Sequence, residues 1–112
     1  MTIQHWSEYL WLVQLGDDPA FADDLDTLHA DLTDAGQMPH IVLDLSDVQH
    51  VNSSNLSQIL RVRKLAIDGE TRLKLCCPTD AVWAILLATG LDKVFDFSGD
   101  TATALAELQL PQ

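Results

Sequence analysis

The sequence has few basic residues, and none of them precedes Arg61. Six lysines and arginines stand against seventeen aspartates and glutamates, which gives a formal net charge of −11 at pH 7. Nucleic acids and anionic membranes attract proteins through basic patches. We therefore expect no nucleic acid partner, and we expect the acidic surface to steer a protein partner that carries a basic patch.

Long hydrophobic runs are also missing. The longest apolar run covers residues 81–88, far short of the roughly 20 residues that span a bilayer. The first residues lack the basic start and the small-residue cleavage site of a signal peptide. These absences predict no direct membrane insertion and a cytoplasmic location.

Cysteine occurs only as the neighbouring pair Cys76 and Cys77. The Cα atoms of neighbouring residues lie about 3.8 Å apart, too close for an unstrained disulfide, so we expect two thiols. No histidine or further cysteine stands at zinc-finger spacing. We interpret the pair as two small residues that close a strand, and we expect neither a metal nor a cofactor.

Catalytic signatures are absent as well. The sequence contains no GxSxG, GxGxxG or P-loop motif, and His50, four residues before Ser54, is not evidence of a base within reach. We therefore expect a protein that is not an enzyme.

What is present is the pattern of one α/β domain over residues 1–112. A chain of 112 residues with 47% hydrophobic residues can bury a core without disulfides or metal. Short apolar runs predict five strands, at residues 3–6, 9–15, 41–45, 72–76 and 94–97. The expected order is β-β-α-β-α-β-α-β-α, an open mixed sheet packed with about four helices.

The helices follow from capping residues and apolar stripes. Asp18 and Pro19 signal the start of a first helix, which runs to about residue 34 before Gly36. A second extends from residues 52–55, which are good N-cap residues, to about residue 68. A third, which Thr79 can cap, covers residues 80–89, and a fourth follows Gly99. The stripes predicted to face the core are Phe21, Leu25, Leu28, Leu32 and Ala35 in the first helix, and Leu56, Ile59, Leu60, Arg63 and Ile67 in the second.

Ser53 and Ser54 stand where a strand-to-loop segment enters the second helix. Function in open α/β sheets favours the carboxyl ends of strands and the helix N-termini that face them. A helix N-terminus favours an anion, including a phosphoryl group on serine. The simpler interpretation is that the serines cap the helix, but a cap needs only one hydroxyl.

The segment IVLDLSDVQHVNSSNLSQIL at residues 41–60 resembles the signature of STAS domains, especially bacterial anti-sigma factor antagonists, and TGLDKVF at residues 89–95 is similar to that family's helix-to-strand segment. The resemblance implies a STAS-like fold. It also implies that an anti-sigma factor, itself a serine protein kinase, phosphorylates the second serine. Only the unphosphorylated antagonist then binds the kinase and releases the sigma factor.

The resemblance assigns the acceptor to Ser54, with Ser53 as second choice. Asn52 stands where the family usually has Asp, and Asn55 where it usually has Gly. We expect Asn55 to add bulk beside the acceptor, because glycine there lets a kinase approach closely. The residues expected to bind the partner are Asn52, Ser53, Ser54, Asn55, Ser57 and Arg61.

Other features leave alternatives open. Arg61, Arg63 and Lys64 either dock an acidic segment or form a solvated helix face. Trp83 and Leu87 form a partner patch if exposed, or core if the last helix covers them. The resemblance also allows a structural STAS subunit of a membrane transport or signalling assembly, or a small nucleotide- or lipid-binding domain. We expect a monomer or weak dimer.

Overall fold

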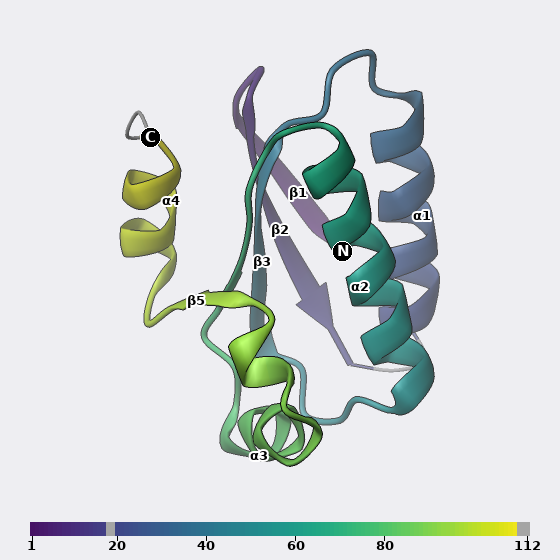
Figure 1. The fold of residues 1–112 in the computed structure, drawn as a ribbon, viewed down its shortest axis with the longest axis vertical. Helices are drawn as coiled ribbons and strands as arrows, with labels where there is room; N and C mark the ends of the chain where they lie inside the picture. The colour runs from purple at the N-terminus through teal and green to yellow at the C-terminus, as the bar shows by residue number, and fades with distance from the viewer. Residues whose placement is uncertain (18–19, 110–112) are drawn as a thin grey trace.

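The computed structural model describes residues 1–17 and 20–109. Its elements follow the predicted order (Figure 1). They are β1 (Thr2–Ser7), β2 (Leu10–Gly16), α1 (Ala20–Asp34), β3 (His40–Asp47), α2 (Ser53–Asp68), β4 (Leu73–Cys76), α3 (Asp80–Thr89), the 3₁₀ helix η1 (Leu91–Lys93), β5 (Asp96–Ser98) and α4 (Thr101–Gln109).

The strands form one mixed sheet in the order β1-β2-β3-β4-β5. β1 and β2 pair as an antiparallel hairpin, whereas β2, β3, β4 and β5 run parallel. The carboxyl ends of the parallel strands therefore lie at one edge of the sheet. The predicted open mixed sheet with helices packed over it is confirmed.

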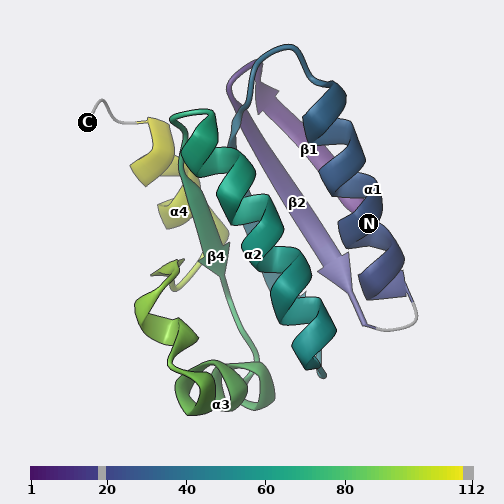
Figure 2. The same ribbon diagram turned by 45° about the vertical axis from the view of Figure 1, so that its right-hand side comes forward.

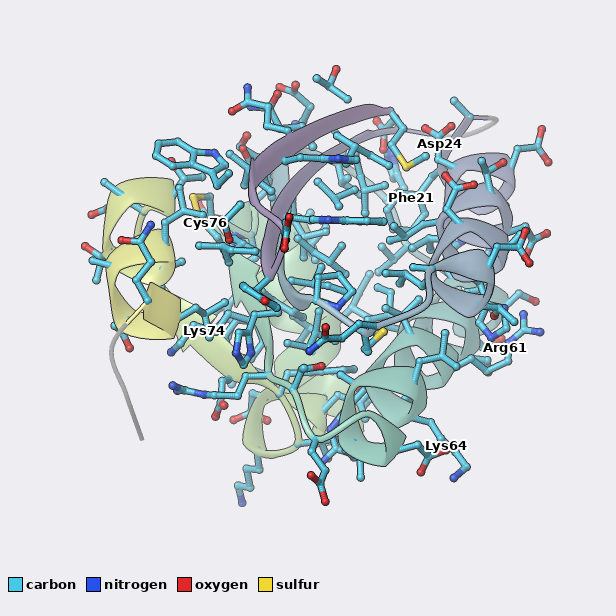
Figure 3. All side chains as sticks on the ribbon, turned by 90° about the horizontal axis from the view of Figure 1, so that it is seen from above. Phe21, Asp24, Arg61, Lys64, Lys74 and Cys76 are labelled. Atoms are coloured by element: carbon cyan, nitrogen blue, oxygen red, sulfur yellow. A yellow bond between two sulfur atoms is a disulfide. The ribbon has the colours of Figure 1, made fainter. Side chains whose placement is uncertain are left out.

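Two layers of helices cover the sheet. Helices α1 and α2 lie side by side on one face, α4 lies alone on the other, and α3 sits beyond the end of the sheet (Figures 1 and 2). The view in Figure 3 separates the layers, with Phe21 between the sheet and α1, and Cys76 and Lys74 on the side of α4. The larger core thus lies under α1 and α2.

The stripe predicted for α1 is confirmed at Phe21, Leu25, Leu28 and Leu32, which are all buried. The stripe predicted for α2 is only partly right. Its buried residues are Asn55, Leu56, Gln58, Ile59, Val62 and Ala66. Ile67 is 53% exposed, because the spacing of about 3.6 residues from Ile59 leads through Val62 to Ala66. The predicted line through Leu60, Arg63 and Ile67 also has helical spacing, but it runs along the edge of the buried face, where Leu60 and Arg63 are half-buried.

Two further boundaries differ from expectation. Residues 91–93 form the 3₁₀ helix η1, and the last strand begins at Asp96, two residues later than predicted. Gly90 supplies the left-handed backbone (φ 75°) that ends α3 and leads into η1. The predicted helix start at Asp18 and Pro19 lies outside the described residues.

The structure joins the sulfur atoms of Cys76 and Cys77 in a disulfide, so the expectation of two thiols is wrong for this state. Cys77 has a left-handed backbone with φ 61°. The chain turns there at the end of β4, which brings the Cys77 sulfur next to that of Cys76.

No helix in residues 1–17 and 20–109 is both long enough and apolar enough to cross a membrane.

Candidate functional site

The N-terminus of α2 is capped by two asparagines rather than by serine. The Asn55 N–H donates to Asn52 Oδ1 at 2.9 Å, and the Asn52 N–H donates to Asn55 Oδ1 at 3.0 Å. This reciprocal pair is a capping box, which satisfies two backbone donors at the helix start. The cap is therefore made by Asn52 and Asn55, and the interpretation that the serines cap the helix is wrong.

Ser53 and Ser54 occupy the first turn of α2 with exposed side chains. Ser57 and Arg61 are exposed one and two turns further along the same helix. Neither serine hydroxyl makes a hydrogen bond within the described part of the chain. Both hydroxyls are thus available to another molecule.

Asn55 follows Ser54 about 100° further around the helix, and it is only 1% exposed. Its side chain points into the protein, so it adds no bulk beside Ser54, contrary to expectation. The predicted steric obstacle to an approaching kinase is absent, because the amide is used in the capping box and in a contact with Gln58.

A buried polar network fixes α2 against α1. Asn55 Nδ2 donates to Gln58 Oε1 at 3.3 Å, and Gln58 Nε2 donates to the Ala22 carbonyl and to Asp26 Oδ1, both at 2.9 Å. Arg61 adds a loose ion pair to Asp26 at 3.9 Å. Because buried amides must be paired, these bonds set the position of the serine-bearing turn relative to α1.

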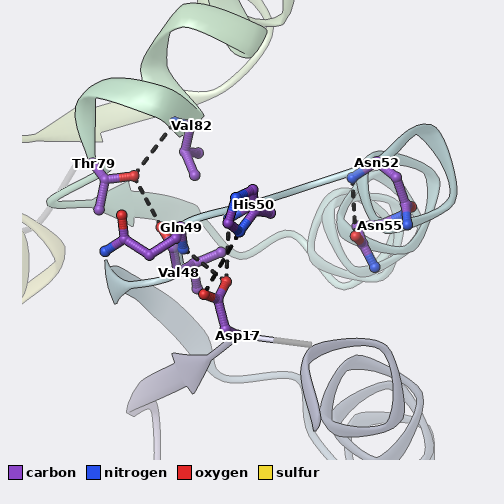
Figure 4. Close-up of polar contacts among 8 residues, drawn as sticks. All are labelled: Asp17, Val48, Gln49, His50, Asn52, Asn55, Thr79 and Val82. Atoms are coloured by element: carbon purple, nitrogen blue, oxygen red, sulfur yellow. Dashed lines mark hydrogen bonds and ion pairs between the residues drawn. The ribbon is translucent and has the colours of Figure 1, made fainter. Parts of the chain in front are cut away.

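The loop before α2 is held from two sides (Figure 4). Asp17 Oδ1, at the end of β2, accepts the N–H groups of Gln49 at 2.7 Å and His50 at 3.1 Å. From the other side, the Thr79 hydroxyl donates to the Val48 carbonyl at 2.9 Å and accepts the Val82 N–H at 3.4 Å. The loop therefore connects the N-termini of α2 and α3.

Sequence reasoning found Thr79 as the cap of α3, which the structure confirms, but it missed Asp17 and Gln58 as positioning residues. Both act on segments more than thirty positions away in the chain. A polar residue in a loop and a glutamine on a helix carry no periodic signal, so only the three-dimensional contacts identify them.

The electrostatics of this turn suit an anion. The first turn of α2 contains no acidic residue, and the aligned peptide dipoles place partial positive charge at the helix start. Among the basic residues, Arg61 and Lys64 pair with Asp26 and Asp68 respectively. These exposed pairs match the interpretation of a solvated, balanced helix face.

Helix α3 presents an unusually apolar surface close to this loop. Only Val82 and Leu86 of the helix are buried, whereas Trp83 is 36% and Leu87 is 51% exposed. Trp83 packs edge-on against Phe97 at 5.1 Å between ring centroids. Of the two alternatives for Trp83 and Leu87, exposure is the one observed, since α4 packs on a face of the sheet while α3 lies beyond its end.

Solved structures share this fold. A STAS domain protein of Planctomyces limnophilus superposes with a TM-score of 0.81 at 16% identity, covering 97% of both chains. TM1081 of Thermotoga maritima, a candidate anti-sigma factor antagonist, gives 0.76 at 18% identity, with 97% of this chain and 94% of that chain covered. The unphosphorylated anti-sigma factor antagonist SpoIIAA gives 0.72 at 10%, with 95% and 94% covered.

No curated protein sequence matched the chain. A family model did match, that of the STAS domain, over residues 18–104. That match spans most of the 112 residues, including the capped serine turn. The chain therefore belongs to the STAS domain family.

Proposed function

We propose that this protein is a binding switch of the anti-sigma factor antagonist type, in which a partner anti-sigma kinase phosphorylates Ser54. The observation that carries the proposal is that Ser53 and Ser54 are exposed in the first turn of α2 while Asn52 and Asn55 complete the cap. A modified hydroxyl at this position removes nothing from the fold. The similarity to SpoIIAA and other antagonists supports the partner class.

A phosphate on Ser54 is compatible with the folded state. It brings about −1.5 to −2 charges, which the N-terminal end of a helix dipole stabilises. No acidic side chain in the first turn of α2 opposes it. The phosphate therefore acts on what binds to this turn, because a strongly hydrated dianion replaces a small neutral hydroxyl at the contact.

The partner surface combines this turn with the apolar side of α3. The exposed polar residues are Asn52, Ser53, Ser54, Ser57 and Arg61. Asn55, which was also expected to bind the partner, is buried and is left out of the proposed surface. The exposed apolar residues of α3 are Trp83 and Leu87, on a helix whose cap Thr79 is bonded to the loop that leads to Ser53. In such a surface the apolar part contributes affinity for the partner, and the part that phosphorylation changes controls whether the partner binds.

In this proposal the chain itself performs no catalysis. The kinase activity belongs to the partner, and the chain supplies the acceptor hydroxyl and the recognition surface. Dissociation after phosphorylation is the signal that regulates transcription, and neither a cofactor nor a metal takes part in the switch.

The direct test is incubation of the chain with its cognate anti-sigma kinase and ATP, followed by intact mass measurement. The expected result is one added phosphate, which is lost in Ser54→Ala and retained in Ser57→Ala, an exposed serine one turn away. Retention of the phosphate in Ser54→Ala with loss in Ser53→Ala would move the acceptor to Ser53. No added mass in any form would contradict the proposal.

A further inference from the structure

A second group of reactive side chains lies on the opposite face of the sheet from the serine turn. β3 and β4 are parallel neighbours, and their register pairs Asp44 with Cys76. Because adjacent strands lie about 4.8 Å apart and paired residues point to the same face, the two side chains meet. Cys77 follows directly, and one ligand atom from each of the three residues lies within 4.8 Å of the others.

Asp44 lacks a partner of opposite charge there. It is only 6% exposed, and its Oδ1 accepts one hydrogen bond, from the Ser46 N–H at 2.9 Å. Lys74, on the same face of β4, is engaged by Glu107 at 2.8 Å. Within the described residues Asp44 forms no ion pair. Buried carboxylates are ordinarily paired with a cation or coordinate a metal.

The backbone of Cys77 adds a second observation. Its φ of 61° is a left-handed conformation that cysteine rarely adopts. The ordinary alternation of a strand would send Cys77 to the face opposite Cys76, but the turn keeps both sulfurs together beside Asp44. Strained backbone of this kind is often retained where it positions reactive groups.

We infer that the reduced forms of Cys76 and Cys77, together with Asp44, bind one thiophilic divalent cation of the zinc type. Two thiolates and a carboxylate suit Zn²⁺, which takes sulfur and oxygen ligands in tetrahedral geometry. A fourth position is left for water. The bound dication offsets two of the three negative charges of the ligands, among them the carboxylate of Asp44, which forms no ion pair within the described residues.

The disulfide of the present structure and the cation are mutually exclusive. A dithiol or phosphine reductant donates two electrons, the S–S bond breaks, and two protons complete the thiols while the reductant is oxidised. Each thiol then releases its proton to solvent as its sulfur binds the cation. The site therefore forms only in reduced protein, and it is independent of the proposed phosphorylation of Ser54.

The test uses the full chain, reduced with a phosphine and titrated with Cd²⁺ while the sulfur-to-metal charge-transfer absorption is recorded. Zn²⁺ affinity is then measured by competition with a chromogenic chelator. The expected result is saturation at one cation per chain in reduced protein and no such absorption in the disulfide form. Reduced protein without saturable one-to-one binding would overturn the inference.

Variants assign the ligands. Cys77→Ser, at a half-buried position, is expected to abolish the charge-transfer band of one-to-one binding. Asp44→Asn keeps both thiols and is expected to weaken binding at least about tenfold. Asp47→Asn, an exposed neighbour on β3, is the matched control and is expected to bind normally. If Cys77→Ser fails to fold, Asp44→Asn decides, and affinity equal to that of the unchanged chain overturns the site.

Discussion

Asn52 and Asn55 separate the fold of the serine turn from its function. In a helix that relied on serine as its cap, a modification of that hydroxyl would also disturb the helix. Here the amide side chains of the two asparagines bond each other's backbone N–H groups. The intervening hydroxyls of Ser53 and Ser54 are consequently free to change without loss of the cap.

The cap assignment predicts unequal effects of alanine substitutions. Asn52→Ala is expected to lower the free energy of unfolding by about 1 kcal/mol, since one backbone donor loses its acceptor. Ser53→Ala and Ser54→Ala are expected to change it by less than about 0.5 kcal/mol, as exposed positions do. Urea denaturation measures all three. A larger loss in Ser54→Ala than in Asn52→Ala would show that serine is the cap.

The residue at position 55 gives a second prediction. Asn55→Gly, which restores the residue usual in the antagonists that the segment resembles, removes the bonds to Asn52 and Gln58. It also adds glycine to a helix, so stability is expected to fall by about 1–2 kcal/mol. Thermal and urea unfolding report the change. An unchanged or raised stability would mean that the buried amide network contributes little.

His40 predicts a pH effect. Its Nδ1 accepts a hydrogen bond from the backbone N–H of Arg72 at 3.0 Å. Burial, assisted by the positive charge of the Arg72 side chain, lowers the pKa of His40 below its ordinary value of 6.5. As the pH falls, the unfolded chain binds a proton at His40 before the folded chain does. The contribution of His40 to stability is therefore fully present above pH 6.5, and it declines as the pH falls through 6.5 toward the lowered pKa.

The measurement is the free energy of unfolding between about pH 7.5 and pH 5.5, compared with His40→Gln, which keeps an acceptor but does not titrate. The variant is expected to lose less stability over this range than the unchanged chain. Since the other histidines are common to both proteins, equal slopes would refute the assigned role of His40.

At the scale of elements, α3 is an apolar helix that the fold only partly uses. Leu86 is 1% exposed and Leu87 is 51% exposed, although they are neighbours. Leu86→Ala is expected to lower the free energy of unfolding by about 2–4 kcal/mol. Leu87→Ala is expected to change it by less than about 0.5 kcal/mol but to weaken binding of the anti-sigma partner. Calorimetry of binding decides, and unchanged affinity would remove α3 from the partner surface.

Elements whose signals are local were predictable from the sequence. The stripe of Phe21, Leu25, Leu28 and Leu32 fixed the buried face of α1 correctly. The same approach failed for Ile67, because an apolar residue near a helix end resembles core until the sheet beneath is known. Likewise, the doubled serine located the candidate site, but the roles of Asp17 and Gln58 depend on segments that only the fold brings together.

At the scale of the whole molecule, the two proposed sites lie on opposite faces of one sheet. The serine turn of α2 lies with α1 on one side, and the cluster of Asp44, Cys76 and Cys77 lies with α4 on the other. The whole chain carries a net charge of −11. We propose that this charge attracts a partner with a basic patch over long range, and that the contacts at α2 and α3 determine how tightly the partner binds.

The central claim is that a charge on Ser54 weakens partner binding without unfolding the protein. The most direct measurement is the affinity of the anti-sigma partner for Ser54→Glu, compared with Ala102→Glu, which adds the same charge at an exposed position of α4. We predict at least about fivefold weaker binding for Ser54→Glu alone, the lower end of ordinary coupling energies, with unchanged circular dichroism. Equal affinity of the two folded variants would contradict the switch.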